Sequence, residues 1–334
     1  MGVILPALIV VAAGLRPPEP TVTLVRSSFI YQSAPFPSCH AATIVQTHSG
    51  KIVAAWFGGT AESNPDVKIY LSELEGQTWS PPREVAKGVS PEGELRACYN
   101  PVLFQPKHGP LLLSYKAGTG PQTWWGLLTE SKDEGKTWSA PIRLPDGILG
   151  PIKNKPYELP DGTLLCPSSA EDHGWQVHFE FTKDNGKTWT KTEPVNDGKT
   201  IGAIQPSILH LGGMHLRAIG RTRQGELFSV DSPDNGRTWG PMTLTDVPNP
   251  NSGTDAITLR DGRHLLVYND SKTQRTPLCV ALSTDGEHWK KALTLEDIPG
   301  EFSYPSLIQA QDGLVHVVYT WNRRRICHAI LRVE

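Results

Sequence analysis

Several side chains of the sequence have the chemistry needed to bind or cleave a sugar. His40 sits between small residues, and an imidazole exchanges protons near neutral pH, so it is a candidate acid or base; the alternative is a buried core histidine. Glu62 and Asp66 are two carboxylates in one short loop. Trp124 begins a Trp-Trp pair whose rings either stack on sugar rings or pack in the core.

Cationic and amide side chains supply a second group of candidates. Five of them could clamp an anionic sugar such as a uronate, although surface charge is the competing interpretation: Arg96, Lys116, Lys153, Arg221 and Arg223. Gln205 and Asn269 are predicted to bind hydroxyl groups. An oligosaccharide or polysaccharide is one partner that such side chains suit.

The overall charge excludes other partners. Lys and Arg number 32 against 34 Asp and Glu, a net charge of −2, which gives no electrostatic footprint for nucleic acid or an anionic membrane. The run Arg323–Arg325 is predicted to be a solvated turn. Five widely spaced cysteines without a CxxC pair argue against a disulfide framework and a zinc site, so no metal or cofactor is expected.

The N-terminus predicts export. Residues 1–14 are an apolar run ending in small residues, and residues 16–20 are rich in proline, a pattern typical of a signal peptide and linker. A basic start is missing, and a ragged apolar terminus is the alternative. No later stretch approaches the roughly 20 apolar residues of a membrane span. A secreted or periplasmic location is expected.

A short repeat indicates how the candidates are positioned. Three segments share Asp, Gly, Thr and Trp at fixed spacing: Ser131–Trp138, Thr182–Trp189 and Ser232–Trp239. Weaker copies end at Trp79 and Trp289, so the five tryptophans are separated by 59, 51, 50 and 50 residues. Asp and Gly suit a β-turn, and one Asp per turn supplies too few oxygens for calcium. The interval suits a four-stranded propeller blade.

A second repeat sets the number of blades. Six units read as an apolar strand, a glycine turn and another apolar strand, from residues 41–57 to residues 305–319. The last unit lacks the Asp-Gly-Thr-Trp repeat, whereas Thr21–Tyr31 has the pattern of a single strand, so the last unit and this strand are expected to pair. Such a closure leaves no sheet edge exposed. The sequence predicts an all-β fold, a single six-bladed β-propeller over residues 21–334.

From Thr21 onward the sequence resembles the Asp-box repeats of the sialidase superfamily, in its Asp-Gly-Thr-Trp segments (the boxes), in their spacing and in the six units. The resemblance implies an arginine triad that clamps the sialic acid carboxylate. The first clamp arginine belongs to an Arg-Ile-Pro phrase, but this chain has Ser38–Ala41 there. Sialic acid is therefore a doubtful substrate.

The resemblance also implies catalytic roles. Tyr304, in the phrase Phe302–Leu307, matches the nucleophilic tyrosine, and Asp255 stands where the family keeps the carboxylate that activates it. Glu62 and Asp66 are the carboxylates available for the acid/base role. His40 takes the place of the clamp arginine.

The leading prediction is an exo-acting glycoside hydrolase on an extracellular glycan. Two alternatives remain open. A polysaccharide lyase would use histidine or tyrosine to remove the C5 proton of a uronate. A propeller that only binds glycans or a protein is the third possibility, since fold does not fix function. Substrate and oligomeric state stay undetermined.

Overall fold

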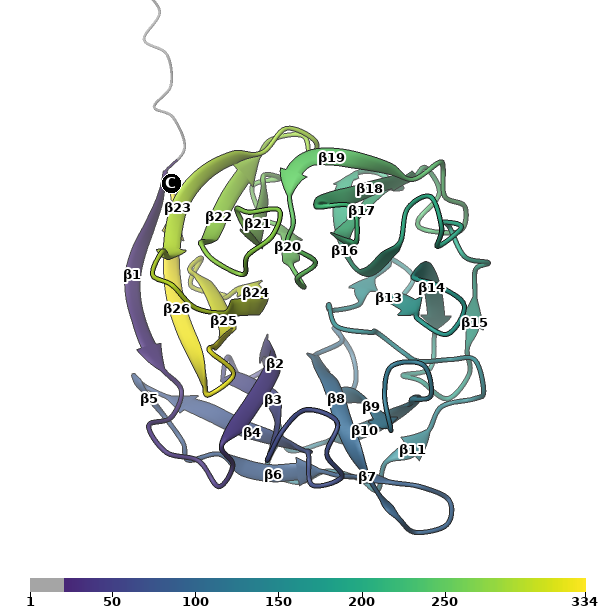
Figure 1. Cartoon of the computed structure of the whole chain (residues 1–334), viewed down its shortest axis with the longest axis vertical. Helices are drawn as coiled ribbons and strands as arrows, with labels where there is room; N and C mark the ends of the chain where they lie inside the picture. The colour runs from purple at the N-terminus through teal and green to yellow at the C-terminus, as the bar shows by residue number, and fades with distance from the viewer. Residues whose placement is uncertain (1–20) are drawn as a thin grey trace, which may run out of the picture.

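The computed structural model describes residues 21–334 as a ring of six antiparallel sheets (Figure 1). This part of the chain contains no α-helix, and so none that could cross a membrane. The predicted all-β, six-bladed propeller is confirmed. The proposed signal peptide and linker, residues 1–20, lie outside the described residues.

The first three blades follow one another along the chain, with the first long strand of blades 1 and 2 nearest the ring axis. Blade 1 contains β2 (Ser38–Gln46), β3 (Ile52–Gly59), β4 (Lys68–Glu75), β5 (Thr78–Trp79) and β6 (Arg83–Ala86). Blade 2 contains β7 (Gly88–Val89), β8 (Leu95–Phe104), β9 (Leu111–Gly118), β10 (Trp125–Ser131) and β11 (Ile142–Arg143). Blade 3 contains β12 (Tyr157–Glu158), β13 (Leu164–Ala170), β14 (Gln176–Thr182) and β15 (Thr190–Lys191).

The last three blades complete the ring. Blade 4 contains β16 (Ala203–Gly212), β17 (His215–Thr222), β18 (Glu226–Ser232) and β19 (Thr243–Pro248). Blade 5 contains β20 (Asp255–Thr258), β21 (His264–Asn269), β22 (Leu278–Ser283) and β23 (Lys290–Glu296). Blade 6 contains β24 (Phe302–Gln309), β25 (Val315–Trp321), β26 (Arg325–Val333) and, as its outer strand, β1 (Val22–Phe29).

Blade 6 is closed by the two ends of the chain. β1 pairs antiparallel with β26, from Val22 opposite Val333 to Phe29 opposite Cys327. The predicted pairing of the terminal strands is confirmed. Because the outer strand of blade 6 comes from the N-terminus, ring closure depends on contacts about 300 residues apart in sequence.

The hydrophobic core is divided into six clusters, one between each pair of neighbouring blades. The tryptophan that ends each box packs toward the preceding blade; the Trp239 ring, for example, stacks on Phe179 with centroids 3.8 Å apart. Such aromatic pairs contribute about 0.5–1.5 kcal/mol beyond their buried area. The repeated tryptophans are structural, as the sequence indicated.

The Asp-box turns are fixed by local hydrogen bonds. In the first strong copy, Asp133 Oδ1 accepts from the Thr137 amide at 2.8 Å and Asp133 Oδ2 accepts from the Thr137 hydroxyl at 2.6 Å, while the Gly135 amide donates to Ser131 Oγ. Gly135 has φ 93°, which a glycine adopts without strain. The Asp and Gly therefore hold a hairpin.

Four inner strands carry the same irregularity near their first residues. The strand register slips at positions where the residues Ala41, Asn100, Gln205 and Tyr304 have φ between 39° and 59°. In three of them a proline follows, which cannot donate to the ladder and so suits a bulge. A bulge re-aims the side chain that it displaces, and the displaced side chains of β16 and β24, Gln205 and Tyr304, meet in a hydrogen bond.

The seam between blades 6 and 1 contains a buried chain of rings. The Trp79 indole donates to His328 Nδ1 at 3.2 Å, and His328 Nε2 lies 3.0 Å from His316 Nδ1. Since the indole only donates, His328 is the Nε2–H tautomer and donates to His316. Burial holds the pKa of His328 at about 3, so both imidazoles are neutral at neutral pH.

Candidate functional site

Tyr304 lies at the bulge of β24 and is only 8% exposed. Its hydroxyl oxygen accepts a hydrogen bond from Arg221 Nη1 at 2.5 Å and a longer one from Gln205 Nε2 at 3.3 Å. Within residues 21–334 no carboxylate is hydrogen-bonded to this oxygen. Tyr304, Arg221 and Gln205, all predicted site residues, therefore meet at one point.

The approach of β17 to β16 places Arg221. A Cβ at Gly220 would lie 2.9 Å from the Gln205 carbonyl oxygen, so a glycine is required for this packing. Asn251 Oδ1 accepts from Arg221 Nε at 2.7 Å and fixes the plane of the guanidinium. Arg221 is thus pre-oriented toward the Tyr304 oxygen.

An aromatic and acidic wall stands beside Arg221. The Trp175 ring lies 4.9 Å from the guanidinium carbon of Arg221 and 4.2 Å from that of Arg223. Glu171 belongs to the same loop between β13 and β14. Burial raises the pKa of Glu171, although Arg221 and Arg223 counteract it. Glu171 is therefore the carboxyl group best suited to hold a proton here.

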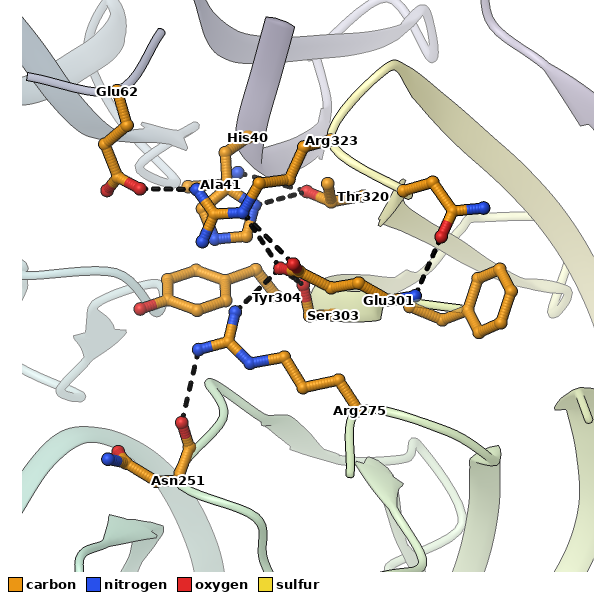
Figure 2. Close-up of polar contacts among 12 residues, drawn as sticks. His40, Ala41, Glu62, Asn251, Arg275, Glu301, Ser303, Tyr304, Thr320 and Arg323 are labelled. Carbon is orange, nitrogen blue, oxygen red and sulfur yellow. Dashed lines mark hydrogen bonds and ion pairs between the residues drawn. The ribbon is translucent and has the colours of Figure 1, made fainter. Parts of the chain in front are cut away.

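A chain of ion pairs lies over the other side of the tyrosine (Figure 2). Arg275 Nη1 donates to Glu301 Oε1 at 2.8 Å, and Arg323 Nε donates to both oxygens of Glu301 at 3.0 and 3.2 Å. Arg323 Nη1 in turn donates to Glu62. Burial raises the pKa of Glu301, but Arg323 and Arg275 outweigh it and keep the pKa below its ordinary value. Glu301 is therefore ionised.

His40 packs against the tyrosine ring. The ring centroids of His40 and Tyr304 are 4.2 Å apart, and His40 Nδ1 lies 3.0 Å from Thr320 Oγ1. Burial lowers the pKa of His40, and the charges of Arg323 and Arg275 lower it further. The imidazole is neutral, and within residues 21–334 its Nε2 has no hydrogen-bond partner. The predicted His40 thus reaches the site with one free nitrogen.

Lys153 holds the backbone next to Tyr304. It is buried, and its ammonium donates to Asn154 Oδ1, to the Thr254 carbonyl at 2.9 Å and to the Pro305 carbonyl at 2.6 Å. Burial lowers the pKa of Lys153 to about 7. Its hydrogen bond to the residue after Tyr304 makes it a positioning residue, whereas the sequence suggested a ligand clamp.

Asp255 does not contact the tyrosine hydroxyl. Its carboxylate accepts from Lys155 Nζ at 2.7 Å, from Ser207 Oγ at 2.9 Å and from the Leu307 amide at 2.9 Å, and its side chain is 2% exposed. The structure corrects the predicted activation of Tyr304 by Asp255, because these donors occupy both oxygens. Asp255 ties blades 3, 4, 5 and 6 together.

The two loop carboxylates have different partners. Glu62 pairs with Arg323 at the mouth of the channel, so it does border the site. Asp66 accepts from the Thr60 amide and the Thr60 hydroxyl, both at 2.9 Å, and closes its own loop. Glu62 stays a candidate, whereas the contacts of Asp66 are those of a turn.

Four other predicted binding residues lie away from the tyrosine or are inaccessible. Lys116 is fully buried and donates to the Pro151 carbonyl, while Asn269 is fully buried and donates to the Phe302 carbonyl. Blade packing, not a ligand, places Lys116 and Asn269. Trp124 packs on Tyr99, and Arg96 pairs with Glu94 and the Leu95 carbonyl.

Five residues of the site were missed from the sequence: Glu171, Trp175, Arg275, Glu301 and Arg323. Glu301 is adjacent to the Phe302–Leu307 phrase and was the one with a local signal. Arg323 was assigned to a solvated turn; it is in a turn, but it points to Glu301 and Glu62. Within the described residues no group of three or more His, Cys, Asp or Glu is arranged to hold a metal ion.

Comparison with known proteins agrees with this architecture. The family model for the BNR repeat-like domain matches residues 50–317, and the chain belongs to that family. Together with this family match, a sialidase relative supports membership of the sialidase superfamily. A sialidase of Bacteroides fragilis is 23% identical over 289 residues, covering 73% of this chain and 52% of the relative, so the chain spans about half of that protein.

Solved structures show the same fold. A protein of unknown function from Dyadobacter fermentans superposes with a TM-score of 0.79 at 20% identity, over 94% of this chain and all of that one. The intramolecular trans-sialidase of Ruminococcus gnavus, in complex with oseltamivir carboxylate, superposes with a TM-score of 0.73 at 14% identity, over 92% and 96% of the two chains. At such identities the likeness shows the fold alone.

Proposed function

We propose that this protein is a glycan-cleaving enzyme, a glycoside hydrolase whose active site surrounds Tyr304. The observation that carries the proposal is the hydrogen bond from Arg221 to the Tyr304 hydroxyl oxygen, at 2.5 Å, on a residue that a bulge turns toward the channel. A charge-assisted bond of this kind favours negative charge on the oxygen that would attack an anomeric carbon.

The proposed reaction has two steps. The Tyr304 hydroxyl releases its proton to water as its oxygen attacks the anomeric carbon, the glycosidic C–O bond breaks, and the carboxyl group of Glu171 gives its proton to the leaving oxygen. Water then attacks the anomeric carbon and loses a proton to the Glu171 carboxylate. The bond from that carbon to the Tyr304 oxygen breaks, and the oxygen takes a proton back from water, which restores both groups. The raised pKa of Glu171 supports its assignment as the acid.

The enclosure of the site supports exo-action. Tyr304 is 8% exposed and lies beneath the ion pairs of Glu301 and Arg323, so the end of a chain can reach it more readily than an internal residue. The export expected from the apolar N-terminus would bring the enzyme to extracellular glycans.

A substrate screen tests the proposal. The full chain is incubated with sialosides, rhamnosides and uronate-capped oligosaccharides, and both released sugar and ultraviolet absorbance are followed. Release of a saturated sugar, reduced at least about a hundredfold in Tyr304→Phe and in Glu171→Gln, supports a hydrolase. Absorbance of an unsaturated uronate would identify a lyase instead. If no substrate is cleaved but a sugar still binds, the protein would be a glycan-binding propeller instead of an enzyme.

A further inference from the structure

The arginine pair beside Tyr304 already holds a carboxylate that belongs to the protein. Arg275 and Arg323 approach Glu301 from blades 5 and 6, and both donate to its oxygens. The guanidinium carbon of Arg275 lies 5.7 Å from the centroid of the Tyr304 ring, so this pair borders the proposed reaction centre. From this arrangement we infer that the sugar ring accepted at Tyr304 is uncharged, and that Glu301 excludes a carboxylate from it. The inference rests on the proposed function.

Glu301 is fixed in this position by neutral groups as well. Ser303 Oγ donates to Glu301 Oε1 at 3.1 Å, and the Glu301 amide donates to Asn322 Oδ1 at 2.8 Å (Figure 2). A ligand carboxylate would either face an ionised Glu301 or displace it from two arginines and a hydroxyl. Like charges at such distances repel, so both routes disfavour an anionic ring.

Each of the two arginines makes one further hydrogen bond to the protein. Arg275 Nη2 donates to the Asn251 carbonyl at 3.3 Å, and Arg323 Nη1 donates to Glu62. The four residues Glu62, Arg323, Glu301 and Arg275 alternate in sign, as Figure 2 shows, and their formal charges cancel. This part of the site therefore offers no net charge to a ligand.

His40 supplies an independent sign of an uncharged ligand. Its side chain is 2% exposed, its ring lies against the Tyr304 ring, and its Nε2 has no partner among the described residues. Burial lowers the pKa of His40, and the charges of four nearby side chains lower it further, so the ring stays neutral: Arg323, Arg275, Arg221 and Lys153. A neutral imidazole nitrogen pairs with a hydroxyl group, which both donates and accepts, and a sugar ring supplies such groups.

The other guanidinium groups of the site are occupied by neutral atoms. Arg221 donates to Asn251 Oδ1, to Gln205 Oε1 and to the Tyr304 hydroxyl. Arg223 lies over the Trp175 ring. Glu171 lies near both arginines, whose charges lower its pKa against the larger effect of burial. The site therefore has the hydrogen-bond donors and the aromatic surface that a polyol ring requires, with its arginines directed to protein groups.

Matched pairs of glycosides test the inference. Each pair has the same ring, with an uncharged group in one member and a carboxylate in the other: a galactoside and a galacturonide, a glucoside and a glucuronide, and a sialoside methyl ester and the free sialoside. Binding to the full chain is measured by titration calorimetry at 50 and 500 mM salt, and turnover is measured in parallel. We expect an uncharged member to be preferred by at least about tenfold, with an affinity that changes little with salt.

The variant Glu301→Gln frees the arginine pair and reverses the preference. It is expected to gain at least about tenfold in affinity for the anionic member, with strong salt dependence, while the uncharged member changes less. Asp231→Asn is the matched control, since Asp231 pairs with Arg217 at 2.6 and 2.8 Å on an outer strand, and its preference should equal that of the wild type.

The outcomes separate the two proposals. If the wild type prefers the anionic member of any pair, the inference is overturned although the enzyme assignment stands. If no member of any pair binds or reacts, the proposed function fails and the inference fails with it. If Glu301→Gln does not fold, the salt dependence of wild-type binding tests the inference instead. An affinity that falls steeply with salt would contradict an uncharged ligand.

Discussion

Replacing Asp255 by Ala should destabilise the protein rather than remove its chemistry. The change deletes a carboxylate that is 2% exposed and accepts from Lys155, from Ser207 and from the Leu307 amide. Lys155 is left with 13% exposure and no opposing charge. Removing one partner of such a pair costs about 3–5 kcal/mol, and the stranded Leu307 amide adds to this.

The assay is a thermal melt followed by circular dichroism, with turnover measured per folded molecule. The thermal midpoint of Asp255→Ala should fall by at least about 6 °C, while turnover of the folded fraction changes by less than about tenfold. Tyr304→Phe should show the opposite pattern. This change removes one hydroxyl group from a residue that is 8% exposed, and it leaves the buried ion pairs intact.

A second substitution tests the physical cause. If the loss comes from an unpaired charge, adding Lys155→Met to Asp255→Ala should recover at least about 1 kcal/mol of unfolding free energy. A stable Asp255→Ala variant whose turnover falls a hundredfold would refute this reasoning and return Asp255 to a chemical role.

Three further measurements follow from the structure. The pKa of Glu171 is raised and its protonated form is the proposed acid, so turnover should fall as pH rises through that pKa. Glu171→Gln should remove this fall in the pH profile together with about 99% of the rate. An unchanged pH profile would exclude Glu171 as the acid. The folded-state pKa of His328, about 3, lies below its ordinary value of 6.5, so the stability that His328 contributes at neutral pH is lost as pH falls from about 6.5 toward 3. The slope is up to about 1.4 kcal/mol per pH unit, and urea melts of His328→Leu should be less steep in pH; equal slopes would contradict the assignment. Gly236→Ala should lower the free energy of unfolding by about 1–3 kcal/mol more than Gly162→Ala. Both glycines have φ above 80°, but only at Gly236 would the new Cβ lie 2.5 Å from the Leu165 side chain. Equal losses of unfolding free energy in urea melts would mean that Leu165 moves aside freely.

The sequence contains the architecture because the information for each blade is local. In each strong box, an Asp and a Thr four residues apart share their hydrogen bonds, as Asp133 and Thr137 do. The spacing of the box tryptophans then counts the blades, and the unpaired first strand predicts the closure. The bulges of β16 and β24 also have a local signal, a polar residue followed by proline, at Gln205 and Tyr304, although the prediction of Tyr304 as a site residue rests on the family resemblance.

Only the tertiary structure decided which side chains meet. Glu171, Arg275 and Arg323 come from three different blades, and no spacing in the sequence relates them to Tyr304. Lys116 and Asn269 looked available, yet blade packing buries them completely. The physical reason is that a repeat fixes the shape of each blade through contacts within about 50 residues, whereas the site is built where the blades converge on the ring axis. There a charge takes its role from partners on other blades, as Arg323 does from Glu62, 261 residues away in sequence, so such pairings could be seen only in the folded ring.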